Sequence, residues 1–130
     1  MERQILISDC QKLLKDIKNV SGISIISACV NASNQKLLRD MADFLRTEKD
    51  NFIVVLGSVI NNRPALVTAL SENLISKGFD ASLIVRKTAH YIDGGGGGKK
   101  DIAQAGGKNA NSLPKAIEKV PEIIQNILEN

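Results

Sequence analysis

The sequence predicts one α/β domain with a mixed sheet of four to five strands and helices on its faces, preceded by an N-terminal helix. Apolar runs typical of buried strands alternate with amphipathic segments at helical spacing. A chain of 130 residues suits a single domain. Hydrophobic residues make up 43% and charged residues 24%, as in ordinary globular proteins. With three Phe and one Tyr, the core must be mainly aliphatic.

The first segment, residues 3–19, carries apolar side chains at spacings of three and four, which predicts an amphipathic helix. Such a helix could pack on the domain, pair with another copy, or be the end of a longer helical segment. We therefore divide the chain into an N-terminal helix over 1–19 and a globular domain over 20–130.

A strand, a helix and a second strand follow. Residues 23–30 are a mostly apolar strand, and Ser33 or Asn34 can cap a helix over about 34–47. Residues 52–60 form a continuous apolar run with many β-branched side chains, typical of a strand buried on both faces. This order predicts a parallel crossover.

The next strand, residues 63–70, should return antiparallel, because Asn61-Asn62 suits a two-residue turn with positive φ. Ser71 can cap a short helix that ends at Gly78.

The last third of the chain is predicted to contain a helix over about 81–92 capped by Asp80, and a short strand over 100–105. Ser112 should cap another helix, which Pro121 breaks or restarts.

Residues 93–109 are the most unusual stretch. Five consecutive glycines, Gly94 to Gly98, precede two lysines, and Gly106-Gly107 follow a short apolar segment. We interpret the run as a shaped loop whose bare amides and lysines meet an anion or another backbone. The alternative is that the glycines only allow a close crossing of a neighbouring strand.

Positive charge gathers around this stretch. The whole chain has a net charge of +3, and residues 81–115 alone contain six bases and two acids. This distribution favours a polyanionic partner, although a solvated lysine surface would look the same.

Catalytic patterns are absent. His90 is the single histidine, and Cys10 and Cys29 are isolated, so neither a nucleophilic nor a zinc constellation is expected. The glycine run lacks the hydroxyl residue of a P-loop, and it follows a predicted helix where a dinucleotide fingerprint would follow a strand. Asp93 and Asp101 flank the glycines and could serve as a pair of carboxylates for acid–base catalysis. We instead expect Asp101 to cap loop amides or to pair with a lysine.

Binding is therefore the function that the residues favour. Consecutive glycines can bring main-chain N–H groups close to a phosphate, lysines add phosphate contacts, and a glutamine amide can both donate and accept. The predicted nucleic-acid-binding residues are Gly95, Gly96, Gly97, Gly98, Lys99, Lys100, Gln104 and Lys108, supported by Arg86 and Lys87.

The stretch from Gly94 to Asn109 resembles the glycine-rich signature at the C-terminus of alanyl-tRNA synthetases, whose typical form is Gly-Gly-x-Gly-Gly-Gly-x-x-Asp-x-Ala-Gln-x-Gly-Gly. The resemblance extends over roughly residues 20–128. It implies a DHH-associated C-terminal domain that binds the outer elbow of tRNA-Ala, supports dimerisation and lies beside the rest of the synthetase. Residues 1–19 would then be the end of an upstream helical part, with Met1 as an expression start.

The same resemblance implies a non-catalytic module of a cytoplasmic, ATP-dependent alanine–tRNA ligase. Magnesium and zinc would belong to other parts of that enzyme, so we expect no cofactor here and no membrane association. Asp93 departs from the pattern, which has glycine there, and Lys100 stands where many members have proline.

Two other functions stay open. One is the associated substrate-binding domain of a DHH-type phosphoesterase acting on short nucleotides, although that family is expected to carry a histidine inside the glycine motif. The other is a pure dimerisation domain that uses the apolar stripes of residues 3–19 and 121–128.

Overall fold

A computed structural model describes residue 8 and residues 10–129 of the chain. The described part contains one six-stranded sheet, which confirms the predicted α/β class and adds one strand to the highest number expected. The strands are β1 (Lys18–Val20), β2 (Ile23–Cys29), β3 (Phe52–Ile60), β4 (Arg63–Leu70), β5 (Gly95–Gly98) and β6 (Ile102–Gly106). Their spatial order is β1-β2-β3-β4-β6-β5.

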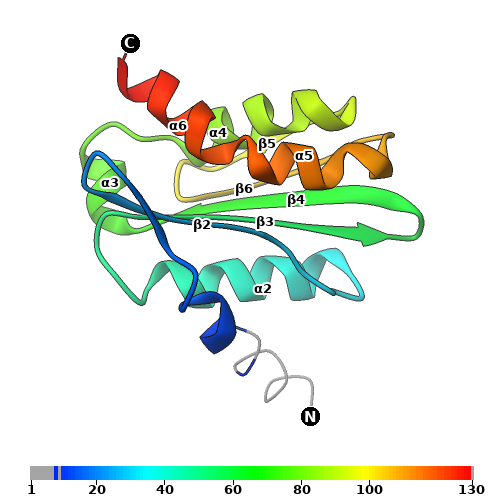
Figure 1. Cartoon of the computed structure of the whole chain (residues 1–130), viewed down its shortest axis with the longest axis horizontal. Helices are drawn as coiled ribbons and strands as arrows, with labels where there is room; N and C mark the ends of the chain where they lie inside the picture. The colour runs from blue at the N-terminus through cyan, green and yellow to red at the C-terminus, as the bar shows by residue number, and fades with distance from the viewer. Residues whose placement is uncertain (1–7, 9, 130) are drawn as a thin grey trace.

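Helices cover both faces of the sheet (Figure 1). They are α2 (Gln35–Arg46), α3 (Glu72–Ser76), α4 (Ala81–Ala89), α5 (Leu113–Glu118) and α6 (Val120–Glu129), with short 3-10 turns η1 (His90–Ile92) and η2 (Ala110–Ser112). In Figure 1, α2 lies on one side of the strands, and α4, α5 and α6 lie on the other.

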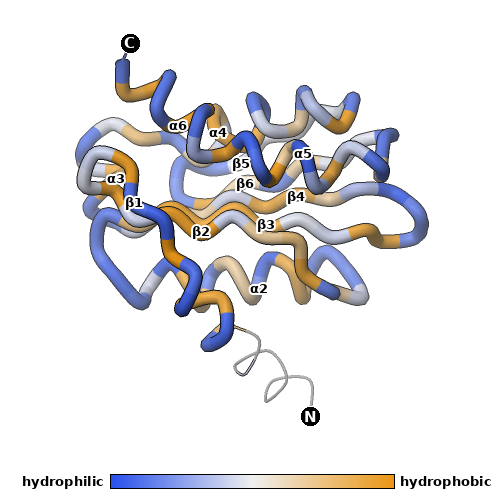
Figure 2. Tube along the Cα trace, viewed as in Figure 1, coloured by the Kyte–Doolittle hydropathy of each residue, from blue (hydrophilic) through white to orange (hydrophobic). Residues whose placement is uncertain are grey.

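The hydrophobic core is divided by the sheet into two clusters. One joins alternate residues of the strands to α3, α4, α5 and α6, and the other joins the opposite residues to α2 and Cys10. Hydrophobic colour is concentrated in β2, β3 and β4 (Figure 2). Because Phe52 to Ser58 are all buried, β3 is covered on both faces, as its continuous apolar run predicted.

The crossover from β2 through α2 to β3 is parallel, and the return from β3 to β4 is antiparallel, both as predicted. Asn61 and Asn62 take φ values of 52° and 65°, the conformation that a two-residue hairpin turn requires. The Asn34 side chain caps α2 by accepting from the Leu37 amide at 2.8 Å, and Asp80 caps α4 through the Ser82 amide at 2.9 Å.

The helix predicted over 3–19 lies partly outside the described residues, and its predicted end is wrong. Residues 8 and 10–13 are helical, but Lys18–Val20 form β1, which pairs antiparallel with β2. Ser21 and Gly22 both have positive φ, so the turn there joins two strands. This strand is short and lies at the sheet edge, where polar side chains are tolerated. Hydrophobic periodicity in the sequence therefore does not indicate it.

The C-terminal helices follow the prediction closely. Pro114 lies in the first turn of α5, and a new helix, α6, begins at Val120, directly before Pro121. Ile123 and Ile124 are buried, and Ile124 and partly buried Ile127 join the core cluster that contains α4, so most of the 121–128 stripe is used within the domain. Leu128 stays 37% exposed.

Candidate functional site

The glycine run is a strand rather than the predicted loop. Gly95–Gly98 form β5 at the edge of the sheet, paired antiparallel with β6 from Gly98↔Ala103 to Gly95↔Gly106. The second glycine pair, Gly106-Gly107, lies opposite the start of β5. The run therefore does meet another backbone, and that backbone is β6.

Alternate glycines in the run have no room for a side chain. A Cβ atom added at Gly96 would lie 2.5 Å from the Ala105 Cα, and one at Gly94 would lie 2.5 Å from the Gly107 Cα. By contrast, a Cβ at Gly95 would meet nothing within 4 Å. Close packing of two backbones accounts for part of the glycine run, which supports the alternative that the glycines allow a close crossing.

Several amides near the glycine strand already have partners. The Gly94 N–H donates to the Ala89 carbonyl at 3.0 Å, the Gly107 N–H donates to the Pro64 carbonyl at 3.1 Å, and the Lys108 N–H donates to the Ile92 carbonyl at 3.0 Å. These three groups are not available to an anion. The outer edge of β5 is different, because an edge strand leaves alternate N–H and C=O groups unpaired.

Lys99 and Lys100 lie on the turn between β5 and β6, and both are exposed. The Lys100 carbonyl accepts from the Ala81 amide at 2.9 Å, which ties this turn to the start of α4. Neither ammonium group forms an ion pair with the part of the chain that the structure describes.

Asp101, next to these lysines, pairs with Arg46 of α2 at 3.1 Å, so the predicted lysine partner is wrong. The backbone amides of Asp101 and Ile102 also hydrogen-bond its carboxyl, which agrees with the other predicted role, the capping of loop amides. Partial burial of the Asp101 carboxyl opposes its ionisation, but the hydrogen bond and charge of Arg46, together with backbone amides, outweigh that effect and lower the pKa of Asp101 below its ordinary value. Arg46 also contacts Asp43 at 2.7 Å. The carboxylate thus ties the turn to α2 and is not placed for general acid–base chemistry.

Gln104 lies in the middle of β6, opposite Gly97 on one side and Val67 on the other. It is half-buried, and its side-chain amide forms no hydrogen bond with the described residues. The amide can therefore donate and accept toward a ligand on the α2 side of the sheet, the side on which its neighbour Ile102 is buried.

Lys108 belongs to the opposite end of the β5–β6 hairpin. A strand rises about 3.4 Å per residue, so the five residues of β6 separate Lys108 from Lys99 and Lys100 by roughly 17 Å. The structure does not bring these lysines into one cluster.

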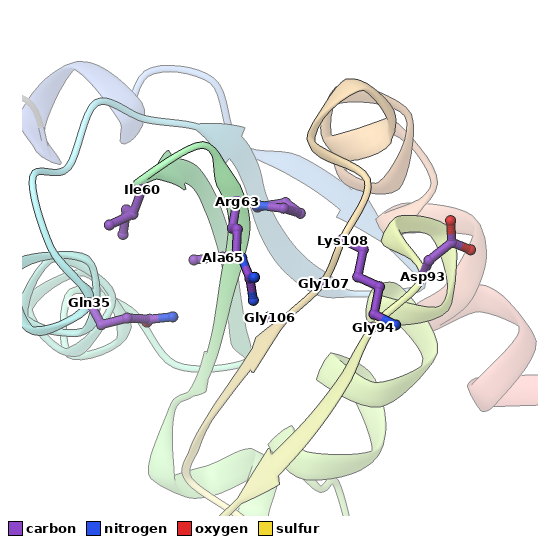
Figure 3. A pocket seen from close by; sticks show the side chains of 10 residues that line it. Gln35, Ile60, Arg63, Ala65, Asp93, Gly94, Gly106, Gly107 and Lys108 are labelled. Atoms are coloured by element: carbon purple, nitrogen blue, oxygen red, sulfur yellow. The ribbon is translucent and has the colours of Figure 1, made fainter.

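A cleft of about 380 Å³ opens at the Lys108 end, and we call it the β4–β6 cleft. Its side-chain walls are Gln35, Ile60, Arg63, Asp93 and Lys108. The lining is completed by Pro64, Ala65, Gly94, Gly106 and Gly107. In Figure 3, Gln35 of α2 and Arg63 of β4 extend toward each other, while Lys108 extends alongside Gly94.

Asp93 takes a left-handed conformation, with φ 55° and ψ 46°. This is a conformation that glycine adopts freely and that Asp tolerates better than most residues. This backbone conformation explains why the motif pattern has glycine at this position. The Asp93 side chain extends away from Arg63 and Lys108 (Figure 3).

Arg86 and Lys87 lie on α4 beside a second hollow, of about 480 Å³, which we call the α4–α6 groove. His90, Tyr91, Ile123 and Asn126 complete its lining. His90 is exposed, and its ring meets the Tyr91 ring edge-on with centroids 6.3 Å apart. Sequence reasoning missed this groove, because Asn126, which lines its other side, lies 35 positions after Tyr91 in the chain.

Arg63 is the other residue that sequence reasoning missed. It lies outside the basic segment 81–115, and only the pairing of β4 with β6 brings it near Lys108. The sequence offers one signal for it: Arg63 is a basic residue directly after the predicted Asn61-Asn62 turn.

Across residue 8 and residues 10–129, the structure has no group of three or more His, Cys, Asp or Glu side chains placed to hold a metal ion. The helices of that same part are too short or too polar to cross a membrane.

The family model of the DHHA1 domain matches residues 10–126. Among curated proteins, the alanine–tRNA ligase of Bacillus subtilis is 35% identical over 116 residues, covering 89% of this chain and 13% of that protein. The alanine–tRNA ligase of Natranaerobius thermophilus is 35% identical over 130 residues, covering 100% of this chain and 15% of that protein. The chain thus spans about a seventh of the length of these relatives.

Among solved structures, the C-Ala domain from Aquifex aeolicus alanyl-tRNA synthetase superposes with a TM-score of 0.75 at 28% identity, over 84% of this chain and 97% of that chain. An exopolyphosphatase-related protein from Bacteroides fragilis superposes with a TM-score of 0.58 at 12% identity, over 99% of this chain and 36% of that chain. The second likeness concerns the fold alone.

Proposed function

Because this chain belongs to the DHHA1 domain family, as its glycine-rich motif predicted, we propose that it is the non-catalytic C-terminal module of an alanine–tRNA ligase. In this proposal the module binds the elbow of tRNA-Ala, supports dimerisation, and so aids aminoacylation and editing by the rest of the enzyme. The observation that carries the proposal is the similarity over most of the chain to alanine–tRNA ligases and to the C-Ala domain.

The electrostatics of the domain support binding to RNA. Exposed cations without ion pairs in the described part lie along the β5–β6 hairpin and on the neighbouring α4: Lys99, Lys100, Lys108, Arg86 and Lys87. Such cations contact phosphates without reading base identity. We expect affinity to come from charge and shape, with tRNA identity read elsewhere in the enzyme.

The glycine strand has a place in this proposal. A strand without side chains lets a ribose–phosphate backbone approach the sheet edge closely, and the outer amides of Gly95, Gly96, Gly97 and Gly98 include donors for phosphate oxygens. Gln104 lies one strand further in, where its free amide can reach a sugar or base edge.

The chemistry of the whole ligase is assigned to other domains. The ATP and magnesium of aminoacylation and the zinc of the editing site have no proposed ligands here, and the module acts by holding tRNA. We place the enzyme in the cytoplasm, where tRNA is charged.

Dimerisation is the less supported part of the proposal. Of the two stripes considered for it, residues 121–128 mostly pack within the domain, so the stripe of residues 3–19 and exposed Leu128 are left to test. Sedimentation of the full chain and of a chain beginning at Cys10, which is buried in the core, tests this part. An equal monomeric mass for both chains would remove dimerisation from the proposal.

The RNA-binding part is tested by titrating the domain with transcribed tRNA-Ala while Lys99 and Lys100 are both replaced by Ala. We expect weaker binding at low salt and a shallower salt dependence. Unchanged affinity would show that the hairpin turn is not part of the RNA-binding surface.

A further inference from the structure

We propose that the β4–β6 cleft is a binding site for one unpaired nucleotide of RNA, and that Arg63 and Lys108 contact its phosphodiester. This inference rests on the proposed function, and it adds a residue, Arg63, and a ligand class that the glycine motif does not indicate.

The size of the cleft fits one nucleotide unit. Its volume of about 380 Å³ lies at the lower end of the roughly 300–1,000 Å³ of small-molecule sites. It therefore suits a single base or sugar with its phosphate, and not a run of stacked bases. In RNA, bases displaced from a helix in loops are the units that proteins take into such hollows.

The charges of the cleft fit a phosphodiester. Arg63 and Lys108 are exposed and form no ion pair within the described part of the chain, so both cations are available. Asp93 also lines the cleft, but its carboxylate extends away from Arg63 and Lys108 (Figure 3). The two cations are therefore left to contact a phosphodiester, whose two non-bridging oxygens can each accept from one of them.

The remaining lining suits the uncharged part of a nucleotide. Ile60, Pro64 and Ala65 supply apolar surface. At Gly106 an added Cβ would meet only the Pro64 carbonyl oxygen within 4 Å, so the bare Cα there leaves room for a flat ring or a ribose. The Gln35 amide extends into the opening from α2 (Figure 3), where it can donate and accept at a base edge. An acidic peptide could also pair with the two cations, so it is tested as a competing ligand.

The first experiment follows the backbone amides of Gly94, Gly106 and Gly107 by NMR while a dinucleoside monophosphate, which contains one phosphodiester, is added to the full chain. We expect saturable shifts at these glycines that are larger than the shifts at Lys99 and Lys100. Inorganic phosphate and an acidic tetrapeptide serve as separate titrations. Equal or stronger binding of either one, or shifts centred on Lys99 and Lys100, would overturn the proposal.

The second experiment uses Arg63→Gln and Lys108→Gln, with Arg39→Gln and Lys115→Gln as matched controls. The controls are exposed cations outside the cleft, without ion pairs in the described part of the chain. We expect each cleft variant to weaken dinucleotide and tRNA binding by about tenfold, and each control by less than about twofold.

The outcomes separate this inference from the proposed function. If the native chain binds tRNA but the cleft variants bind it equally well, the inference fails and the proposed function stands. If the native chain binds the dinucleotide in the cleft but not tRNA, the cleft is a nucleotide site and the proposed function fails. If the native chain binds neither RNA, both fail.

Discussion

The two ends of the β5–β6 hairpin use the same kind of residue in different settings. At the turn end, exposed Lys99 and Lys100 lie on a tight connection that Asp101 ties to Arg46 of α2. At the other end, Lys108 and Arg63 border a cleft of about 380 Å³. At the turn end the cations do not border this cleft, whereas at the cleft end the cations border a cavity that can enclose part of a ligand. Net charge in a sequence segment therefore does not identify a site until the fold shows which cations border a cavity.

The hairpin itself holds the two ends at a fixed separation, so the largest expected effect comes from breaking it. Gly96→Ala adds a Cβ that would lie 2.5 Å from the Ala105 Cα, and the neighbouring backbone cannot yield without losing the pairing of β5 with β6. We expect a loss of about 3 kcal/mol in the free energy of unfolding, measured by urea denaturation.

The control for this change is Gly95→Ala, one residue away, where an added Cβ meets nothing within 4 Å. Its free energy of unfolding should stay within about 0.5 kcal/mol of the native value. Equal losses for the two variants would mean that β5 does not pack against β6 in the way described.

The second prediction addresses the turn end. Replacing both Lys99 and Lys100 by Ala should weaken tRNA binding by about tenfold at low salt and should reduce the slope of log affinity against log salt by about 1.5, since each phosphate contact contributes about 0.7–0.9. Fluorescence anisotropy across a salt series measures both quantities. A variant whose salt slope equals that of the native chain would assign RNA binding to the cleft end alone.

Many helices and strands of this fold can be predicted from the sequence, because residues close together in the chain determine them. Phe52 to Ile60 is apolar throughout, and Asn61-Asn62 supplies the positive φ that a tight hairpin needs. Asn34 and Asp80 cap helices because their side chains reach amides two or three residues ahead. In each case neighbouring residues decide the structure.

The features that were missed depend on distant residues. Glycines have no side-chain alternation and a poor intrinsic preference for strands, so Gly95–Gly98 become a strand only because β6 pairs with them. Asp101 meets Arg46 across 55 positions of sequence, and Arg63 reaches the cleft through the pairing of β4 with β6. No local pattern contains this information.

The third prediction concerns the link between the turn end and α2. Asp101→Asn removes the carboxylate that pairs with Arg46, and we expect a loss of only about 0.5 kcal/mol at neutral pH, because the side chain is 37% exposed and solvent screens the pair. Thermal or urea unfolding at several pH values measures this loss.

The pH dependence has a definite sign. The pKa of Asp101 is lowered in the folded state, so its contribution is present above the unfolded pKa of about 3.9 and is lost as pH falls through the folded value. The difference between the native chain and Asp101→Asn should therefore disappear in acid. Asp16→Asn replaces an exposed carboxylate without an ion pair in the described part, and at neutral pH its free energy of unfolding should match that of the native chain. A difference that grows in acid would contradict the assignment.

The smallest predicted effect concerns Asp93, which also lines the cleft. Asp93→Gly places glycine at a position with φ 55°, which should stabilise the fold by about 0.5 kcal/mol and, by removing a negative charge, should strengthen RNA binding by roughly twofold. Asp93→Asn separates the two causes, because Asn tolerates the same conformation and also lacks the charge. Stronger binding in Asp93→Gly but not in Asp93→Asn would rule out the electrostatic explanation.

The central claim, that this domain holds tRNA by charge and shape, is tested most directly by titrating the native chain with tRNA-Ala and with a non-cognate tRNA across a salt series. The account predicts similar binding of both RNAs at low salt, with affinity that falls steeply as salt rises. Absence of binding to either tRNA at low salt would contradict it.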